Sequence, residues 1–456
     1  MKRRNFITSV GATGSALLVG ASGVTQASEA LDMPSPDASL VGSLDLSQIG
    51  VIDTHVHPPH PMTLSESYDK WNSSFVNSML PSYEYEGKDA LRLKLSEDFK
   101  KHLYNMPRQT GYYNYVARAY DVGPDISSFN QVVTEGIKSG FGQYVEKILD
   151  RENITGMVLQ SQDLKPQRPE SAVPDDRFAW SYPIVDFIQP EWATENGLGS
   201  LKEVSQKITD IMSECVTNGC VGFKSNVAYY RPLVVDPVDQ ATAIRAFNNM
   251  LKNPPDQYKN VPGRGVISMK VADYQEPELK TAFRSYQDYL LKHIFIKAGE
   301  LKVPMIIHTA VGLHPALKFE YNSPLELPRV LLDDDILRAE TQFVLIHTGY
   351  PYYQQVAAML SQFPNLFTDL SFYSKFPGVI EETLRAFLAL APSEKVMHGS
   401  DSNNVPEEMG YCAWNTRHVL AKVLRDYKNN YGWTQRDCEK IANNVLHENA
   451  RRVFKI

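Results

Sequence analysis

The chain has 456 residues, of which 43% are hydrophobic and 22% are charged. This is an ordinary globular composition with enough chain to bury a large core, and the length suits a barrel with insertions better than one small domain. The formal net charge is −7 and the sequence holds no block of basic residues. A nucleic-acid partner is therefore not expected, because phosphate binding needs a basic surface.

The N-terminal segment is typical of an export signal. Arg3 and Arg4 are followed by Asn-Phe-Ile, which resembles a twin-arginine signal, and a weakly apolar run rich in glycine and alanine follows them. Small residues at positions 25 and 27 suit a cleavage site. The run is too short and too rich in glycine to span a bilayer well. We expect a protein that uses the twin-arginine export machinery, is periplasmic or otherwise exported, and has no stable membrane insertion after processing.

The remaining chain predicts one large domain of alternating strands and helices. Residues 1–27 form the expected signal peptide, residues 28–48 a polar linker, and residues 49–456 the domain. Two insertions are expected, at 58–150 and 231–275. Both follow strand ends, where barrel enzymes place loops that cover the substrate.

Short apolar or β-branched runs within this domain are typical of buried parallel strands. The expected strands are 50–55, 154–160, 182–188, 219–225, 303–308, 342–347, 365–370 and 394–399. The expected helices include 199–214, 279–300, 327–340, 352–362, 377–390 and 411–427. The pattern predicts the α/β class and a (β/α)8 TIM barrel with helical insertions after early strands. A doubly wound sheet is the alternative, but no GxGxxG sequence follows the first strand.

Side chains that commonly bind metal ions follow four of the expected strands. The first strand ends in His-x-His, and His55 and His57 share one side because alternate strand residues point the same way. Two other strands end in His308 and His347, and the last runs into Asp401. One such histidine is usually structural. A barrel brings strand ends together around one axis, so the repeated occurrence favours a site for a divalent cation.

These motifs resemble the amidohydrolase superfamily over about 400 residues, in particular its amidohydrolase-2 branch. The resemblance implies that His55, His57, His308 and Asp401 bind one divalent metal ion. It also implies that Asp401 shuttles protons and that His347 is a general acid/base or polarises a carbonyl. The segments starting at Gly222 (GFKSNVAY) and at His347 (HTGYPY) are similar to the amidohydrolase domain of glutamine-synthetase-like fusion proteins.

Three further residues are candidates for contact with substrate. Lys224 closes the fourth expected strand, where binuclear members of the superfamily carry a carboxylated lysine between two metal ions. We favour an unmodified, catalytic Lys224 that binds a substrate carboxylate or polarises a carbonyl; a carboxylated Lys224 would imply a second metal. Tyr229 and Arg231 are expected to clamp an anionic substrate, since the planar guanidinium suits a carboxylate. An ordinary surface-loop pair is the alternative.

The resemblance implies an exported metal-dependent hydrolase. It would act on an amide, ester or lactone bond of a small, carboxylate-bearing substrate through a metal-activated water, with zinc or manganese as the expected ion. Two alternatives stay open: a metal-dependent non-oxidative decarboxylase of an aromatic or enol acid on the same site, and a non-catalytic exported ligand-binding protein. A homodimer is the default expectation for a soluble enzyme.

Supporting roles are expected for three residues near the strand ends. Asp53 precedes the His-x-His pair and is expected to make a supporting contact. Asp369 is a supporting or substrate-binding candidate, and His398 is expected to pack in the barrel wall. The four cysteines form no CxxC pair, and although Cys215 and Cys220 could pair in an oxidising compartment, buried free thiols are the favoured interpretation.

Overall fold

The computed structural model describes residues 44–57, 59, 94, 98, 102, 105–255, 257–264, 267–311, 318–403 and 405–456. The chain divides into two units, Met1–Ser43 and Leu44–Ile456, and the structure below is that of the second unit. The expected signal peptide and most of the expected linker lie outside the described residues. Within the part that is described, no helix is both long and apolar enough to cross a membrane.

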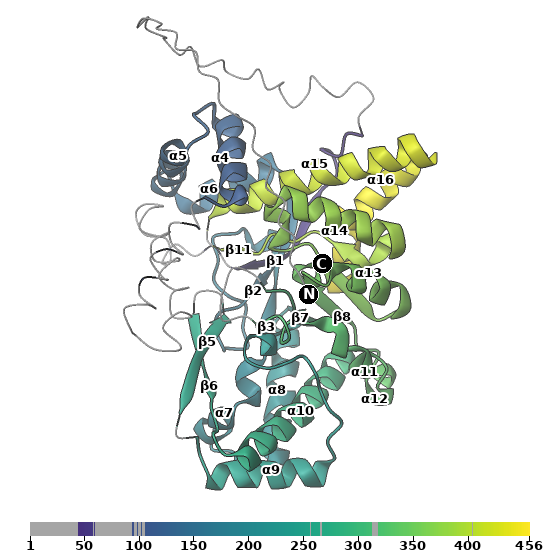
Figure 1. Ribbon diagram of the computed structural model, residues 1–456. Helices are drawn as coiled ribbons and strands as arrows, with labels where there is room; N and C mark the ends of the chain where they lie inside the picture. Colours follow the sequence, from purple (N-terminus) through teal and green to yellow (C-terminus); the bar gives the residue numbers. More distant parts are fainter. Residues whose placement is uncertain are drawn as a thin grey trace, which may run out of the picture. The chain divides into compact units, whose positions relative to one another are not determined.

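Parallel strands form the centre of the fold (Figure 1). The sheet has nine strands in the order β10-β9-β8-β7-β4-β3-β2-β1-β11. Their bounds are β1 Val51–His57, β2 Ile154–Gln160, β3 Phe178–Pro183, β4 Cys220–Ser225, β7 Met305–His308, β8 Phe343–Ile346, β9 Leu366–Asp369, β10 Val396–Met397 and β11 Ser402–Asn403. Every neighbouring pair is parallel, as the succession of strand–helix units requires.

The segment that holds β10 and β11 closes this sheet into a barrel. β10 pairs with β9, and β11 pairs with β1. Between them, the amide of Thr54 donates to the carbonyl of His398 at 3.1 Å and the amide of Asp401 donates to the carbonyl of His55 at 2.8 Å. Residues 396–403 thus fill the eighth barrel position and bond to the strands on both sides. The predicted TIM barrel is confirmed.

The third strand differs from its expected position. It spans Phe178–Pro183, and the apolar run that follows forms a 3₁₀ helix at Val185–Ile188 instead of continuing the strand. Pro183 fixes its own φ and has no N–H to donate to the sheet, so the strand ends there. The run is still buried, and burial alone does not distinguish a short strand from a helical turn.

Helices surround the barrel. Those that follow the strands are α8 Leu201–Thr217, α10 Pro277–Glu300, α11 Pro328–Leu331, α12 Asp334–Arg338, α13 Tyr353–Gln362, α14 Pro377–Leu390 and α15 Pro406–Tyr431. Proline occupies the first turn of α10, α14 and α15, where its missing N–H costs nothing. The single helix expected at 327–340 is divided in two, because the Asp333 side chain accepts from the amides of Asp335 and Ile336 and starts α12 as a new helix.

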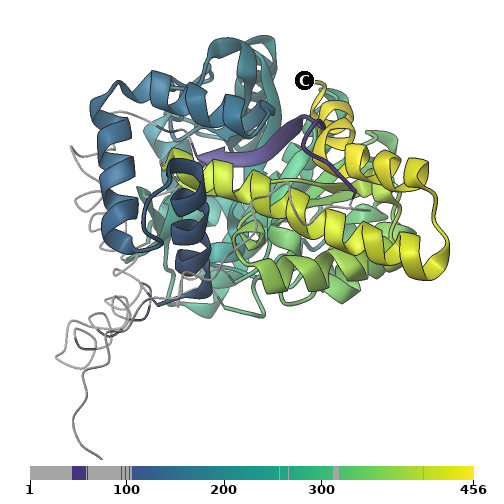
Figure 2. The same cartoon turned by 90° about the horizontal axis from the view of Figure 1, so that it is seen from above.

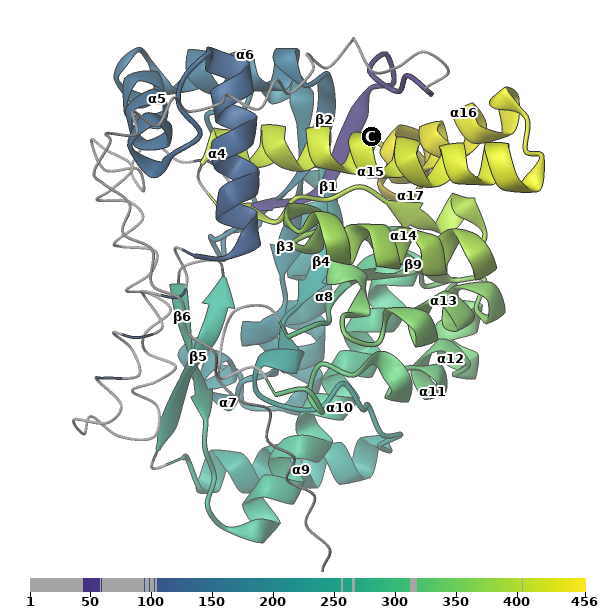
Figure 3. The same cartoon turned by 45° about the horizontal axis from the view of Figure 1, so that its top comes forward.

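Within residues 105–151 the first insertion forms α4 Pro107–Tyr120, α5 Ile126–Lys138 and α6 Phe141–Arg151. α4 and α6 lie beside α15 (Figures 2 and 3). The contact includes a partly buried ion pair of 2.7 Å between Arg151 of α6 and Glu407 of α15, and Tyr144 donates to the same carboxylate. The second insertion contains α9 Gln240–Lys252 and an antiparallel hairpin, β5 Tyr258–Arg264 and β6 Ile267–Ala272. α7 Pro190–Glu195 precedes both α8 and this hairpin.

The barrel interior has its own small apolar core. It consists of inward side chains of the strands and of the C-terminal helix α17, Asn449–Phe454. Its members are Ile52, Val158, Ile306, Val344, Ile346, Phe367, Met397, Ala450, Val453 and Phe454. The helix α16, Gln435–Asn443, leads to α17. All four cysteines are buried and free in this structure.

Candidate metal centre

A bulge in β1 turns both histidines of the His-x-His motif into the barrel. Ile52 belongs to the inner core, so strict alternation would place His55 on the opposite face. From Asp53 to Val56, β1 advances three residues, whereas the paired stretch of β2 advances two, from 157 to 159. The extra residue reverses the alternation, and Val56 now faces the outer core. His55 and His57 therefore point toward the carboxyl ends of the other strands.

The residues predicted from four strand ends lie together. The Nε2 atoms of His55 and His57 lie 3.4 and 3.3 Å from the same oxygen, Oδ1 of Asp401. The ring of His347 is 5.4 Å from that of His55 and 4.8 Å from that of His308. One ligand atom from each of His55, His347 and Asp401 falls within 4.8 Å of the others. The position of His347 therefore suits either a metal ligand or an acid/base residue next to the metal.

Left-handed backbone conformations occur at these strand ends. His347 has a φ of 68° and Thr348 of 61°, Asp401 of 52°, Ala310 of 74° and Phe372 of 62°. Such conformations cost about 1–3 kcal/mol for residues other than glycine and are found where function needs them. Ile346 faces the inner core, so ordinary alternation would turn the next side chain outward. The change of backbone direction at His347 instead brings the imidazole into the site.

Asp369 and Ser371 hold His347 in place. The Oδ1 atom of Asp369 accepts from the His347 amide at 2.9 Å and from the Ser371 hydroxyl at 2.6 Å, and Oδ2 accepts from the Thr54 hydroxyl at 3.0 Å. Ser371 Oγ also lies 2.8 Å from Nδ1 of His347. Burial raises the pKa of Asp369 to about 6, although these hydrogen bonds oppose the rise. These contacts agree with the supporting role expected for Asp369. Asp53, for which a supporting contact was also expected, accepts a hydrogen bond from the Ser400 amide at 2.9 Å.

Lys224 and Tyr229 also border the cluster. The Nζ atom of Lys224 is 3.5 Å from Nε2 of His55, and the side chain is 2% exposed. Burial lowers the pKa of Lys224 to about 7, although Asp401 and Asp369 favour its charged form. The ring of Tyr229 lies 4.3 Å from that of His308. Both residues are therefore placed to contact a molecule bound at the strand ends.

The protonation states of the cluster suit a divalent cation. Burial, together with nearby positive charge, lowers the pKa of His55 to about 3 and that of His308 well below its usual range. Burial also lowers the pKa of His347, so its ring is neutral at pH 7. Burial raises the pKa of Asp401, but His347, His55 and His57 outweigh this effect and hold it well below its usual range. Neutral imidazoles and one carboxylate are the ligand forms that zinc and similar ions require.

The spacing of these atoms passes a simple fit test. Ligand bonds of about 2.0–2.1 Å in a tetrahedral arrangement separate two ligand atoms by roughly 3.3–3.4 Å. The two histidine-to-carboxylate distances of 3.4 and 3.3 Å have this value and are longer than a charge-assisted hydrogen bond. Among the described residues, neither ring nitrogen of buried His308 has a hydrogen-bond partner. His55, His57 and Asp401 therefore have the spacing of ligands to one divalent ion, and the unpartnered nitrogens of His308 are free to serve as a further ligand.

Arg231 lies in a different environment from the one expected for a substrate clamp. It forms a buried ion pair with Asp288 of α10, donates to Gln287 Oε1 at 3.1 Å, and donates to the carbonyl of Val234 at 2.6 Å. Asp288 also binds Arg284 at 3.1 Å. The donors of Arg231 thus anchor the loop after β4 to α10. The cluster of histidines and Asp401 is assembled without any described contact to this guanidinium.

Two supporting residues had no signal in the sequence. Ser371 follows β9 in a loop, and a lone serine there has no characteristic spacing. Lys375 donates from Nζ to the carbonyl of Asp401 at 2.7 Å and lies 3.5 Å from Glu408. Both act on backbone or ring atoms of residues that the motifs did identify. By contrast, His398 is fully buried against Thr416 of α15 at 3.0 Å, in the barrel wall where it was expected.

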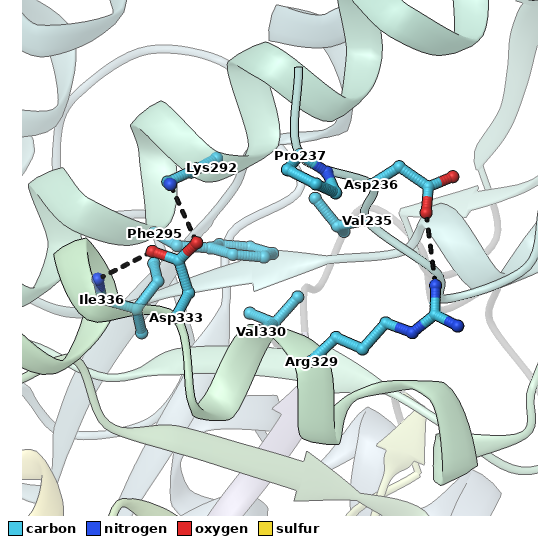
Figure 4. Close-up of a pocket in the computed structure, with 9 residues that line it drawn as sticks. All are labelled: Val235, Asp236, Pro237, Lys292, Phe295, Arg329, Val330, Asp333 and Ile336. Atoms are coloured by element: carbon cyan, nitrogen blue, oxygen red, sulfur yellow. Dashed lines mark hydrogen bonds and ion pairs between the residues drawn. The ribbon is translucent and has the colours of Figure 1, made fainter. Parts of the chain in front are cut away.

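A separate cavity of about 260 Å³ lies among α10, α11 and α12 (Figure 4). Its apolar lining includes Phe295, Val330 and Ile336. Its charged groups are already paired, since Lys292 binds Asp333 at 2.8 Å and Arg329 lies 3.6 Å from Asp236. None of the predicted site residues lines it.

The fold and the cluster together define a TIM barrel with a candidate metal centre at the carboxyl ends of its strands. Residues 269–456 match the family model described as amidohydrolase. The curated protein fluG of Emericella nidulans is 24% identical over 262 residues, which cover 55% of this chain and 28% of that protein. This chain thus spans less than a third of the length of the curated relative. The predicted resemblance to the amidohydrolase-2 branch is confirmed by the family match over residues 269–456 and by the similarity to fluG.

Solved structures support the fold. A protein of Lactobacillus casei assigned as a metal-dependent hydrolase gives a TM-score of 0.63 at 17% identity, covering 91% of this chain and 98% of that one. The uronate isomerase of Thermotoga maritima gives 0.63 at 11% identity over 90% and 95%. The glucuronate isomerase of Caulobacter crescentus gives 0.62 at 12% identity over 90% and 92%. At these identities the similarity concerns the architecture alone.

Proposed function

We propose that this protein is a metal-dependent hydrolase that acts on an amide, ester or lactone bond of a small, carboxylate-bearing molecule. One divalent ion, zinc or manganese, would be held by His55, His57, His308 and Asp401. The observation that carries the proposal is the convergence of the imidazoles of His55 and His57 on a single oxygen of Asp401, at 3.4 and 3.3 Å. This convergence occurs at the carboxyl ends of barrel strands, where barrel enzymes have their active sites.

A bound divalent ion lowers the pKa of a coordinated water from about 15.7 toward about 7 for zinc and polarises a substrate carbonyl. Side chains of this protein would carry out the proton transfers of the reaction. Asp401 is ionised and accepts the proton that the attacking water loses, then passes it to the leaving group. His347 presents Nε2 toward the cluster because Ser371 occupies Nδ1. His347 therefore accepts or returns a proton at the scissile bond as a general acid/base.

Lys224 serves as an unmodified lysine in this proposal. Its Nζ lies beside His55 in a nearly closed environment, where a charged ammonium binds a substrate carboxylate or polarises a carbonyl. Tyr229 borders the same space next to His308 and would contact the bound molecule through its ring. A carboxylated Lys224 would instead bridge two metal ions.

Elemental analysis of the full chain, purified without chelators, tests the proposal. We expect about one divalent ion per chain, and hydrolysis of members of a panel of amides, esters and lactones that carry a carboxylate. About two ions per chain would indicate a carboxylated Lys224. Release of carbon dioxide from aromatic acids, without hydrolysis of the panel, would show that the protein is a decarboxylase and not a hydrolase. No ion, with none taken up on reconstitution, would contradict the proposal.

We also propose that the protein is exported through the twin-arginine route, on the strength of Arg3, Arg4 and the small residues before position 28. Replacing both arginines by lysine should leave the precursor inside the cell. Mass spectrometry of the exported wild-type protein should find an N-terminus at Ser28. Export of the double-lysine variant at the wild-type level would contradict this route.

A further inference from the structure

One face of the first turns of α4 carries buried polar groups that lack partners. Arg108, Gln109 and Tyr112 are 4%, 6% and 2% exposed. Nε of Arg108, Oε1 of Gln109 and the hydroxyl of Tyr112 find no hydrogen-bond partner in the part of the chain that the structure describes. Arg108 and Tyr112 are one helical turn apart and so lie on the same face. Buried polar groups are nearly always paired, so such a cluster indicates a partner beyond the described residues, and a bound ligand would supply one.

The start of α4 is itself open to an anion. Met106, the residue before the helix, provides no side-chain cap, and the first turn contains no acidic residue. The helix spans 14 residues, so the amides of its first turn and its dipole favour negative charge there. The unpaired guanidinium of Arg108 adds a full positive charge to this end of the helix.

This face of α4 is connected through α15 to the strand ends that carry the candidate metal centre. The ring of Tyr112 packs 4.8 Å from that of Tyr411 on α15, and the Tyr112 hydroxyl is within electrostatic range of Arg108 and Glu408. Glu408 accepts from the amide of Asn403 at 3.3 Å, and Asn403 is the register partner of His57 in the barrel. A short chain of contacts thus joins the α4 face to the end of β1.

The positive charge of Arg108 is not neutralised by the acidic groups near this face. Glu408, the acidic group closest in this chain of contacts, is engaged by Lys375 at 3.5 Å and by the Asn403 amide. Among the described residues, no carboxylate forms an ion pair with Arg108. Burial raises the pKa of Tyr112, so its hydroxyl stays protonated and is available as a donor. The face therefore offers one cation and one neutral hydroxyl to a ligand.

We propose that Arg108 and Tyr112, at the start of α4, bind the carboxylate of the substrate whose scissile bond lies at the metal centre. This inference rests on the proposed function, and it gives α4 the anion-binding role that the sequence suggested for Arg231. The planar guanidinium matches a carboxylate with two parallel hydrogen bonds, and the Tyr112 hydroxyl completes the contact. The first insertion of the barrel thereby selects substrates by their negative charge.

Two probes of similar shape test this site: benzoate, which carries the carboxylate, and benzamide, which is neutral. Binding of each to the full chain, with and without added zinc, is measured by calorimetry for the wild type, Arg108→Met, Arg108→Lys and Tyr112→Phe. Arg118→Met is the matched control, because Arg118 is on the same helix but is exposed and lies over Trp414 at 4.2 Å. Circular dichroism checks that each variant is folded, and elemental analysis records its metal content.

We expect Arg108→Met to weaken benzoate binding about tenfold or more, and Arg108→Lys and Tyr112→Phe to weaken it less. Benzamide binding and the Arg118→Met variant should match the wild type. The effect of Arg108 should persist in a His308→Ala background, which separates this site from direct binding of benzoate to the metal. Unchanged benzoate affinity in Arg108→Met, equal loss of both probes, or no benzoate binding to the wild type would overturn the proposal. If Arg108→Met does not fold, unchanged affinity in Arg108→Lys and Tyr112→Phe would overturn it.

The two proposals can fail separately. A wild-type chain without metal contradicts the hydrolase and leaves the comparison of benzoate affinities intact. A metal-loaded chain whose benzoate affinity does not depend on Arg108 contradicts the carboxylate site alone.

Discussion

Ser371 Oγ lies 2.8 Å from Nδ1 of His347, and the same hydroxyl lies 2.6 Å from Oδ1 of Asp369. The carboxylate of Asp369 can only accept, so the single hydroxyl hydrogen of Ser371 is donated to it. The serine oxygen then accepts from Nδ1–H of His347. This assignment, made from the hydrogen-bond network, leaves Nε2 of His347 with a free lone pair.

Replacing Ser371 by alanine should release the His347 ring from this tautomer. We expect the activity to fall about 10- to 100-fold, as is usual when a partner behind an active-site histidine is removed. Ser371→Thr keeps the hydroxyl and should retain most of the activity. Ser374→Ala, three residues further along the same loop, serves as the control. Ring ¹⁵N chemical shifts of His347 that are the same in wild type and Ser371→Ala would contradict the tautomer assignment.

His308 and His347 should differ in their effect on metal binding. The proposed function makes His308 a metal ligand, with both ring nitrogens free of described partners, and makes His347 the general acid/base, although one of its ring nitrogens lies within 4.8 Å of ligand atoms of His55 and Asp401. We expect His308→Ala to lose most of its metal and its activity together. His347→Ala should keep most of its metal but lose activity by about 10²–10⁴-fold, the usual contribution of a general acid/base. Metal loss of equal extent in both variants would make His347 a ligand.

The sequence predicted the barrel and the central cluster for one physical reason. Parallel strands are buried and apolar, so their ends are recognisable, and closure of a barrel brings those ends together. The local backbone conformation at the strand ends could not be predicted from the sequence. The bulge that turns His55 inward and the left-handed φ of 68° at His347 follow from tertiary pairing, not from residue type.

The surroundings of the cluster were also beyond prediction from sequence. Arg231 was expected near the substrate because it follows the fourth strand by a few residues, but Asp288, 57 residues later, binds it. A pairing across that separation has no local signature. Ser371 and Arg108 lie in a loop and in an insertion, where no periodic pattern marks them.

Arg231 and Asp288 should contribute to stability more than to binding. The two side chains are 7% and 1% exposed, so replacing Arg231 by methionine leaves a buried carboxylate whose remaining partners are Arg284 and the amide of Asp236. We expect the free energy of unfolding to fall by about 3–5 kcal/mol in denaturant titrations. The double variant Arg231→Met, Asp288→Asn should recover part of this loss. A stable Arg231→Met protein with a greatly raised KM would instead assign Arg231 to the substrate.

Acid should destabilise the barrel wall through His398. This side chain is fully buried, and burial together with Arg417 lowers its pKa to about 3 from 6.5. The folded state resists protonation that the unfolded state accepts, so the stabilising effect is complete above pH 6.5 and is lost as the pH falls toward 3. Each pH unit in this window costs about 1.4 kcal/mol for this one group.

We therefore expect His398→Asn to be less stable than wild type at pH 7, because packing and the contact with Thr416 change, but to lose less stability between pH 6.5 and pH 4. The measurement is the free energy of unfolding of metal-free protein at several pH values. Other buried histidines contribute equally to both proteins, so the difference between the two curves isolates His398. His102→Asn, at an exposed position, should leave the wild-type curve unchanged. Parallel curves for wild type and His398→Asn would show that His398 is not responsible for the acid sensitivity.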